Sequence, residues 1–154
     1  MSDMNFKGTP VVTSEQAEIV RMIRNHCRAY MTHMTEIIGP DQQLSWWLTL
    51  DRNKNKLFVF SVTAQDVPGI VYDEDIGYGL CRLIGDRWWV SGGLAPDWQG
   101  RGFGKKLFEF LVEQTGLPCW LEVLGHNMRA YNTYKEIGFA EIDRVGDIVT
   151  MVKR

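Results

Sequence analysis

The sequence predicts an α/β (α+β) fold in which a mixed, mostly antiparallel central sheet of six or seven strands is flanked by about four helices. Short segments of alternating apolar residues are interleaved with segments whose apolar residues recur every three or four positions. Turn signals separate these segments at short intervals. The chain of 154 residues, 45% apolar and 23% charged, has the size and composition of one compact domain. We therefore expect a single domain over residues 1–154.

The first half of the chain carries two predicted helices and the start of the sheet. A capping box at residues 13–16 (TSEQ) begins a helix whose apolar stripe runs as far as Met34 and which Gly39-Pro40 ends. A shorter helix is expected over residues 41–50. The alternating, aromatic-rich residues 56–63 predict a strand.

The second half predicts a meander followed by alternating helices and strands. An acidic connection (Asp73, Glu74, Asp75) should lead into this part, and tight turns at Gly85-Asp86 and Gly146-Asp147 indicate two hairpins. The expected elements are, in order, strands 76–84 and 87–94, a helix beginning near Phe103, strand 119–124, helix 127–137, and strands 139–145 and 148–153. The full order is then β-αα-βββ-α-β-α-ββ.

Charge and cysteine content exclude several classes of function. The chain has 17 basic and 19 acidic residues, without the basic excess expected of a nucleic-acid-binding protein. Its three cysteines have no metal-ligand spacing, which favours buried, reduced thiols, a cytoplasmic protein and no metal site. No apolar run approaches the roughly 18 residues of a membrane span, so we expect no membrane partner.

Residues 99–104 (QGRGFG) form a glycine-rich loop between a predicted strand and a helix. Glycines allow close approach of the backbone to a ligand, and the free N–H groups of a helix start bind phosphate. Lys105 and Lys106 add positive charge in a first turn that usually prefers acids. The spacing does not fit a Walker loop, and the preceding strand belongs to an antiparallel hairpin, unlike a dinucleotide-binding unit. We expect an anionic ligand here.

Two segments together resemble the GNAT superfamily of N-acetyltransferases. The loop at 99–104 looks like its Arg/Gln-x-x-Gly-x-Gly/Ala motif for the pyrophosphate of acyl-CoA. Residues 127–139 match the pattern Asn-x-x-Ala-x-x-x-Tyr-x-x-x-Gly-Phe at every position. Gln99 stands where arginine is frequent, and Lys135-Glu136 reverses a usual order of acid and base. The resemblance covers roughly residues 87–139.

The resemblance implies a splayed cleft between the fourth and fifth strands that holds acetyl-CoA as co-substrate. Gly92-Gly93 would allow close approach of the pantetheine arm, and Asn127 would hydrogen-bond it. An N–H near Leu94 would polarise the thioester carbonyl. The cofactor-binding residues expected on this basis are Gly93, Leu94, Ala95, Gln99, Gly100, Arg101, Gly102, Phe103, Gly104, Lys105, Asn127, Tyr131 and Tyr134.

The implied reaction is direct attack of a primary amine on acetyl-CoA, without a covalent enzyme intermediate. Tyr134 matches the family tyrosine that acts as general acid toward the CoA sulfur, and a core position is its structural alternative. Glu122 is the candidate general base; alternatively it is a solvated charge or pairs with Arg129. His33 and His126 are weaker candidates for the base.

The resemblance implies a small-molecule or peptide amine as acceptor, for which the first two helices would shape a pocket with Tyr30, His33 and Trp46. Rings and carboxylates there would suit a cationic amine, with the acids at 73–75 on the rim. Trp46 and Trp47 could instead be core anchors. The chain could also be a non-catalytic acyl-CoA-binding module or a nucleotide-binding scaffold. The last hairpin offers an edge for a homodimer.

Overall fold

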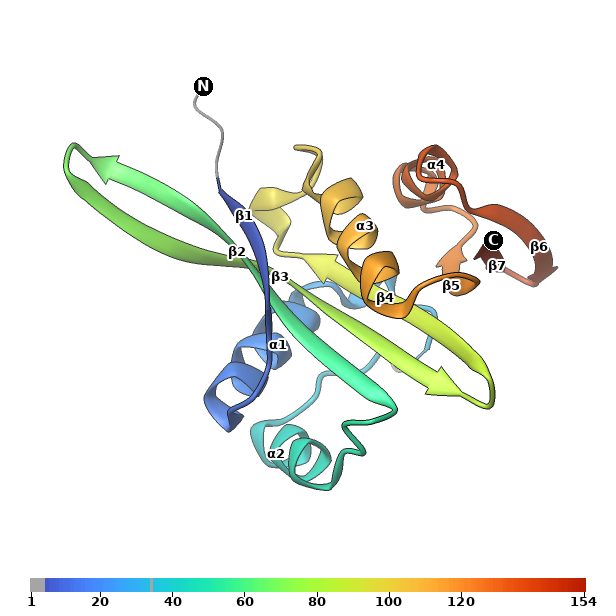
Figure 1. Ribbon diagram of the computed structural model, residues 1–154, viewed down its shortest axis with the longest axis horizontal. Helices are drawn as coiled ribbons and strands as arrows, with labels where there is room; N and C mark the ends of the chain where they lie inside the picture. Colours follow the sequence, from blue (N-terminus) through green and yellow to red (C-terminus); the bar gives the residue numbers. More distant parts are fainter. Residues whose placement is uncertain (1–4, 34) are drawn as a thin grey trace.

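The computed structural model describes residues 5–33 and 35–154 and contains one seven-stranded sheet in the order β1-β2-β3-β4-β5-β7-β6 (Figure 1). Every neighbouring pair is antiparallel except β4 and β5. The strands are β1 (Phe6–Pro10), β2 (Asn55–Val67), β3 (Ile70–Ile84), β4 (Arg87–Leu94), β5 (Cys119–Leu124), β6 (Ala140–Val145) and β7 (Ile148–Lys153). The predicted mixed, mostly antiparallel sheet is thereby confirmed.

The residues that the structure describes also form four α-helices and two short 3-10 helices. The α-helices are α1 (Ser14–His26), α2 (Pro40–Thr49), α3 (Phe103–Thr115) and α4 (Met128–Glu136), and the 3-10 helices are η1 (Arg28–Tyr30) and η2 (Pro96–Trp98). The Thr13 side chain accepts a hydrogen bond from the Gln16 N–H, which completes the expected capping box of α1. Gly138, with φ +106°, follows the C-cap of α4 as expected.

The helices cover opposite faces of the sheet, and each face has its own core. On one face, Val20 of α1 and Trp47 of α2 pack with Val59 and Tyr78 from the strands. On the other face, the apolar side of α3, including Leu107 and Leu111, packs against the sheet together with Tyr134 of α4. Figure 1 shows α1 and α2 on one side of the central strands and α3 on the other. Any opening through the sheet would therefore connect the two helical layers.

Among the described residues, the one parallel strand pair is short. In it, β4 pairs with β5 at two positions, Trp88 with Cys119 and Trp89 with Trp120. The remainder of β4 stays paired with β3 as far as Leu94, and β5 pairs with β7 along its whole length. Strands β4 and β5 therefore diverge after Trp89, which is the splayed cleft that the resemblance implied.

Two predicted element boundaries were wrong. Helix α1 ends at His26, because the chain turns through η1 so that Cys27 packs against the end of β4. Pro40 begins α2 and does not end the first helix. Met34, the last residue of the predicted stripe, lies outside the described residues.

The predicted acidic connection is also part of a strand. Asp73, Glu74 and Asp75 belong to β3, where they pair with residues 61–63 of β2, and Asp73 makes an ion pair with Lys7 at 2.8 Å. The β2–β3 hairpin is thus longer than predicted and projects beyond the helices (Figure 1). Strand β6 forms one edge of the sheet and all its residues are exposed.

Candidate active site

A cavity of about 1320 Å³ lies where β4 and β5 diverge. Its walls come from both helical layers. On one side it is lined by the start of α3 and by α4, and on the other side by α1, α2 and residues 30–33. The cavity therefore passes through the opening in the sheet. We call its two parts the α3–α4 arm and the α1–α2 arm.

The last residue of β4 directs its backbone into this opening. The Ala95 N–H donates to the Ile76 carbonyl at 2.7 Å. This bond flanks the pair of Leu94 and Gly77, which is therefore a non-hydrogen-bonded pair of the antiparallel ladder. The N–H and C=O of Leu94 consequently point away from β3 and toward the gap before β5. The carbonyl accepts hydrogen bonds from Cys27 Sγ at 3.2 Å and from Gln99 Nε2 at 3.0 Å. These contacts fix the strand end from both sides.

The structure gives Gly92 and Gly93 a packing role that the sequence analysis did not foresee. A Cβ on Gly92 would lie 2.5 Å from the Tyr78 carbonyl oxygen, and a Cβ on Gly93 would lie 2.8 Å from Cys27 Sγ. The first contact is with rigid backbone, so no side chain fits at Gly92. Glycine is required here by the neighbouring strand β3 and by Cys27, whether or not a ligand binds.

The glycine-rich loop leaves the start of α3 open. Gly100 (φ +76°) and Gly102 (φ +89°) have backbone conformations that favour glycine, and a Cβ on Gly102 would meet no atom within 4 Å. No side chain caps the helix, so its first N–H groups lack partners within the helix. The Arg129 guanidinium lies near Gly100, 3.5 Å from where a Cβ would be. Open N–H groups beside cations suit a diphosphate.

Nine of the thirteen expected cofactor residues line the cavity. They are Gly93, Leu94, Gln99, Gly100, Gly102, Gly104, Lys105, Asn127 and Tyr134. Asn127 also caps α4, because its side chain accepts a hydrogen bond from the Ala130 N–H.

The other four expected residues are placed elsewhere. Arg101 stacks on Trp98 at 4.7 Å, and Phe103 is buried in the core, so only their backbones face the loop. The Tyr131 hydroxyl donates to Glu141 Oε1 at 3.0 Å, away from the cavity. Ala95 does not line it either. These four residues do not line the cavity, and their contact with a cofactor stays a prediction.

Tyr134 is enclosed between aromatic rings. It makes edge contacts with Phe108, with centroids 4.7 Å apart, and with Phe139 at 6.2 Å. Within the described residues, the Tyr134 hydroxyl makes no hydrogen bond. Every fully buried side-chain oxygen in those residues has a hydrogen-bond partner, so the Tyr134 hydroxyl is not fully buried and reaches the cavity that the residue lines. Burial, with a smaller contribution from nearby Tyr78, raises the pKa of Tyr134 well above its ordinary value. The residue therefore stays protonated and can donate a hydrogen bond into the cavity.

Glu122 and His33 meet across the cavity mouth. Glu122 lies on β5 and His33 follows η1, and Glu122 Oε1 is 3.0 Å from His33 Nε2. The Glu122 side chain is 29% exposed, so the carboxylate is partly desolvated yet reachable. Arg129, the alternative partner considered from the sequence, lies instead beside the glycine-rich loop. The other candidate base, His126, pairs with Asp147 at 2.6 Å.

The α1–α2 arm contains the three expected acceptor residues. Tyr30, His33 and Trp46 all line it, whereas Trp47 is a core residue, 3% exposed, with Arg52 stacked on its ring. Asp73, Glu74 and Asp75 do not line the cavity, so the expected acidic rim is wrong.

Comparison with known proteins identifies the family. The model of the acetyltransferase (GNAT) family matches residues 21–139, more than half of the chain. The chain belongs to the acetyltransferase (GNAT) family. It is therefore an acyltransferase, and the cavity with its glycine-rich loop occupies the matched region. A search of curated proteins found no match.

Solved structures share the GNAT fold over nearly the whole chain. Spermidine N-acetyltransferase from Vibrio cholerae, in complex with CoA and spermine, superposes with a TM-score of 0.76 at 20% identity and covers 96% of this chain and 94% of its own. A domain from Methanocaldococcus jannaschii gives 0.78 at 12% identity over 97% and 98%. The yncA structure from Salmonella typhimurium, with its cofactor acetyl-CoA, gives 0.70 at 16% identity over 97% and 93%.

Sequence reasoning missed two buried polar residues of this GNAT cavity, Arg24 and Tyr78. Arg24 is only 8% exposed, and burial lowers its pKa. Tyr78 is 9% exposed, and burial raises its pKa. Arg24 did carry a signal in the sequence, since it occupies an apolar-face position of α1 at helical spacing between Val20 and Cys27. A charge on a buried stripe indicates function or a buried hydrogen-bond network.

No three His, Cys, Asp or Glu side chains in residues 5–33 and 35–154 lie in an arrangement that could hold a metal ion. Over the same residues, no helix is long and apolar enough to span a membrane.

Proposed function

We propose that this protein is an N-acetyltransferase in which a primary amine attacks acetyl-CoA directly within a ternary complex. The observation that carries the proposal is the cavity through the splayed sheet. It joins the phosphate-binding features of the α3–α4 arm to a second arm, with Tyr134 and Glu122 between them. The two arms offer space for two reactants that meet at one point, which a module that only binds CoA does not need.

The α3–α4 arm fits the chemistry of coenzyme A. The open space at Gly102 and the unpartnered N–H groups at the start of α3 suit the diphosphate, and Lys105 and Arg129 supply positive charge beside them. The free edge of β4 would pair with the pantetheine amides, and Asn127 would bind the same arm. When bound, acetyl-CoA supplies the acetyl group as an activated thioester.

Glu122 would prepare the amine for attack. Its carboxylate accepts the amine proton, directly or through water, while the nitrogen forms its bond to the acetyl carbon. The hydrogen bond to His33 holds the carboxylate in one orientation across the opening. The Leu94 N–H, directed into the gap, would stabilise negative charge that develops on the carbonyl oxygen.

Tyr134 would assist departure of the thiolate as the carbon–sulfur bond breaks. Because burial raises its pKa, full proton transfer to sulfur is uphill, and the hydroxyl acts chiefly through a hydrogen bond that strengthens as charge develops on the sulfur. The products are the acetylated amine and CoA, whose thiolate takes up a proton from solvent because Tyr134 keeps its own. The similarity to a spermidine N-acetyltransferase supports a small amine as the class of acceptor.

Thermal denaturation with CoA, acetyl-CoA, ATP and NAD tests the cofactor assignment. Saturation at about 100 times Kd should stabilise the folded state by about 2.7 kcal/mol. CoA and acetyl-CoA should raise Tm, whereas ATP and NAD should not. An amine panel with detection of free thiol then tests for transfer. Absence of stabilisation by both CoA species would contradict the proposal, and stabilisation without thiol release for any amine would favour a binding module.

A further inference from the structure

The α1–α2 arm extends beyond the part of the sheet that α1 and α2 cover. The core beneath these helices reaches Leu80 of β3, which packs at its edge. Arg82 and Ile84 lie further along the same face of β3 and are exposed. Both nevertheless line the cavity, as does Trp89 of β4. The arm therefore continues as an open groove over the far ends of β3 and β4, whose turn lies to the right of α1 and α2 in Figure 1.

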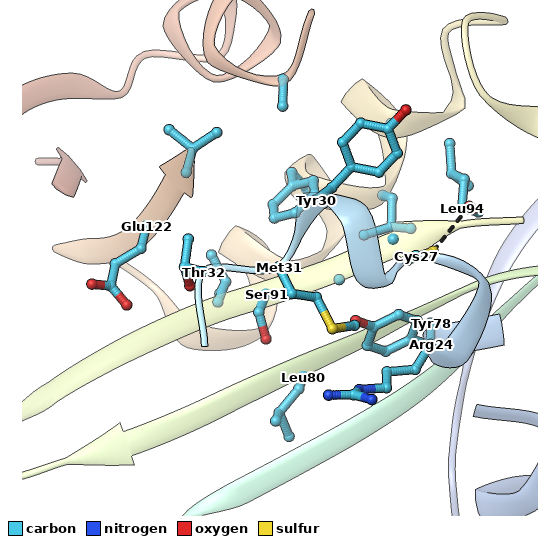
Figure 2. Close-up of a pocket in the computed structure, with 18 of the residues that line it drawn as sticks. Arg24, Cys27, Tyr30, Met31, Thr32, Tyr78, Leu80, Ser91, Leu94 and Glu122 are labelled. Atoms are coloured by element: carbon cyan, nitrogen blue, oxygen red, sulfur yellow. Dashed lines mark hydrogen bonds between the residues drawn. The ribbon is translucent and has the colours of Figure 1, made fainter. Parts of the chain in front are cut away.

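This groove is continuous with the proposed reaction point. Ser91 of β4 pairs with Leu80 of β3, and both line the cavity. Figure 2 shows these two side chains to the right of Glu122 in the view. The next pair on the same face is Trp89 with Arg82, two residues or about 7 Å further along the strands. A molecule whose amine lies at Glu122 could therefore extend its body along the groove.

Two tryptophans from neighbouring strands form an aromatic wall of the groove. Trp89 pairs with Trp120 of β5, and their ring centroids are 6.4 Å apart. Trp120 is 8% exposed, whereas Trp89 is only half-buried and lines the cavity. Glu122 is two residues beyond Trp120 on the same face of β5, a separation of about 7 Å along the strand. The available aromatic surface is thus that of Trp89, a short distance from the carboxylate.

The charges around the groove disfavour a second cation on the acceptor. Outside α4, Glu122 is the only carboxylate among the described residues that line the cavity. Arg82 is the neighbour of Trp89 on β3, and the Arg87 guanidinium lies over the Trp120 ring at 5.0 Å. A second ammonium group placed over the tryptophans would lie near both guanidinium groups and be repelled by them. A neutral body avoids this repulsion.

The groove also favours a body without amide groups. Residues 87–94 of β4 pair with β3, and the backbone N–H and C=O groups of a sheet lie in its plane and not on its face. The groove over this face is therefore lined by side chains, of which Leu80, Ile84 and Trp89 are apolar. A peptide laid across them would bury amide groups without backbone partners, which is costly.

We propose that the acceptor is an arylalkylamine, whose ring stacks on Trp89 while its amine lies at Glu122. This inference rests on the proposed acetyl transfer and names its substrate class. Because two residues of a strand span about 7 Å, roughly three or four carbon atoms are needed between nitrogen and ring. Trp89 is then the residue that selects the acceptor. The polyamine bound by the Vibrio cholerae neighbour fits this groove less well, since its additional cations would approach Arg82 and Arg87.

Matched amines test the inference without altering the protein. 3-Phenylpropylamine and n-propylamine share the amine and the linker, and only the first has a ring. Its kcat/KM should exceed that of n-propylamine and that of spermidine at least about tenfold, because ring stacking and apolar burial are worth this much. The amide of the dipeptide glycyl-phenylalanine tests a peptide acceptor. Equal or better turnover of n-propylamine, spermidine or the dipeptide amide would overturn the proposal.

Trp89 variants test the residue itself. Trp89→Leu should lower kcat/KM for 3-phenylpropylamine about tenfold and leave that for n-propylamine within about threefold. Trp89→Phe, which retains a ring, should recover part of the ratio. Trp88→Leu is the matched control, because Trp88 is on the opposite face of the same strand, beneath Lys56 and outside the cavity. An unchanged ratio in Trp89→Leu would overturn the proposal.

Folding of each variant is checked by its thermal transition. If Trp89→Leu does not fold, the matched amines decide the question with the unaltered protein, and Trp89→Phe supplies the test of the residue. A folded Trp88→Leu should keep the preference for 3-phenylpropylamine, whereas loss of the preference in this control as well would refute the assignment to Trp89.

The outcomes separate this inference from the proposed function. Stabilisation by CoA together with acetylation of n-propylamine or spermidine, but without preference for 3-phenylpropylamine, overturns the inference and leaves the function intact. Absence of stabilisation by CoA overturns the function itself. If CoA binds but no amine is turned over, calorimetric titration of the CoA complex with 3-phenylpropylamine decides. Binding that Trp89→Leu abolishes supports the site, and absence of binding overturns it.

Discussion

His33 Nε2 lies 3.0 Å from Glu122 Oε1, although the two residues are 89 positions apart in the sequence. The contact joins the segment after η1 to β5 and brings together a residue expected to bind the acceptor and a residue expected to act as base. His33 is mostly exposed and Glu122 partly buried. We interpret His33 as a positioning residue for the Glu122 carboxylate, and its removal should have the smaller effect of the two.

Glu122→Gln should lower kcat by 100-fold or more near pH 7, because the amine then has no general base. The loss should shrink as pH rises, since a growing fraction of the amine is already neutral. His33→Ala should cost less, about tenfold. A pH–rate profile by thiol release provides the measurement, with Glu109→Gln, an exposed acid on α3, as control. A uniform loss at all pH values would argue against the role of Glu122 as base.

Tyr134→Phe should keep CoA binding and lower turnover about 10- to 100-fold, because only the hydrogen bond to the departing sulfur is lost. The ring contacts with Phe108 and Phe139 are preserved in the variant. Single-turnover kinetics separate chemistry from product release. Tyr72→Phe, on the β2–β3 hairpin, removes a hydroxyl outside the cavity and should change neither quantity. Unchanged single-turnover rates in Tyr134→Phe would exclude the residue from the reaction.

Gly92→Ala should destabilise the fold by at least about 2 kcal/mol, because the new Cβ would lie 2.5 Å from the Tyr78 carbonyl oxygen. Gly39→Ala is the control, since a Cβ there meets nothing within 4 Å and its φ is −78°. Urea denaturation of both variants gives the free energies of unfolding. Equal stability of the two would show that β4 can move away from β3 to accept a side chain.

The free energy of unfolding should fall at alkaline pH. Burial raises the pKa of the Cys27 thiol from 9.0 to about 11, so the folded state retains the proton longer than the unfolded state. This contribution is fully present below pH 9 and is lost as pH rises toward 11. The loss amounts to roughly 2 kcal/mol by pH 11. Urea denaturation between pH 8 and 11 measures it. Cys27→Ala should show a shallower decline, and an unchanged slope would refute the assignment to Cys27.

Much of the α3–α4 arm could be predicted from the sequence, because its features are local. Glycines at fixed spacing fix the loop conformation, and Gly100 and Gly102 adopt the positive φ that glycine tolerates. Asn127 and Tyr134 lie seven positions apart, so one helix places both at the same cavity. Tyr131 and Arg101 do not line the cavity, because the direction of a side chain depends on neighbours such as Glu141 and Trp98.

The sequence by itself determined the order of elements, the glycine-rich loop and the family, since these rest on periodicity and on motifs within short stretches. Only the tertiary structure decided that α1 ends at His26, that the acids at 73–75 lie within β3, and that Arg24 and Glu122 form opposite walls of one cavity. The physical reason is that burial and charge pairing arise between distant segments. A residue's own neighbours in the chain do not reveal which groups it will meet across a divided sheet.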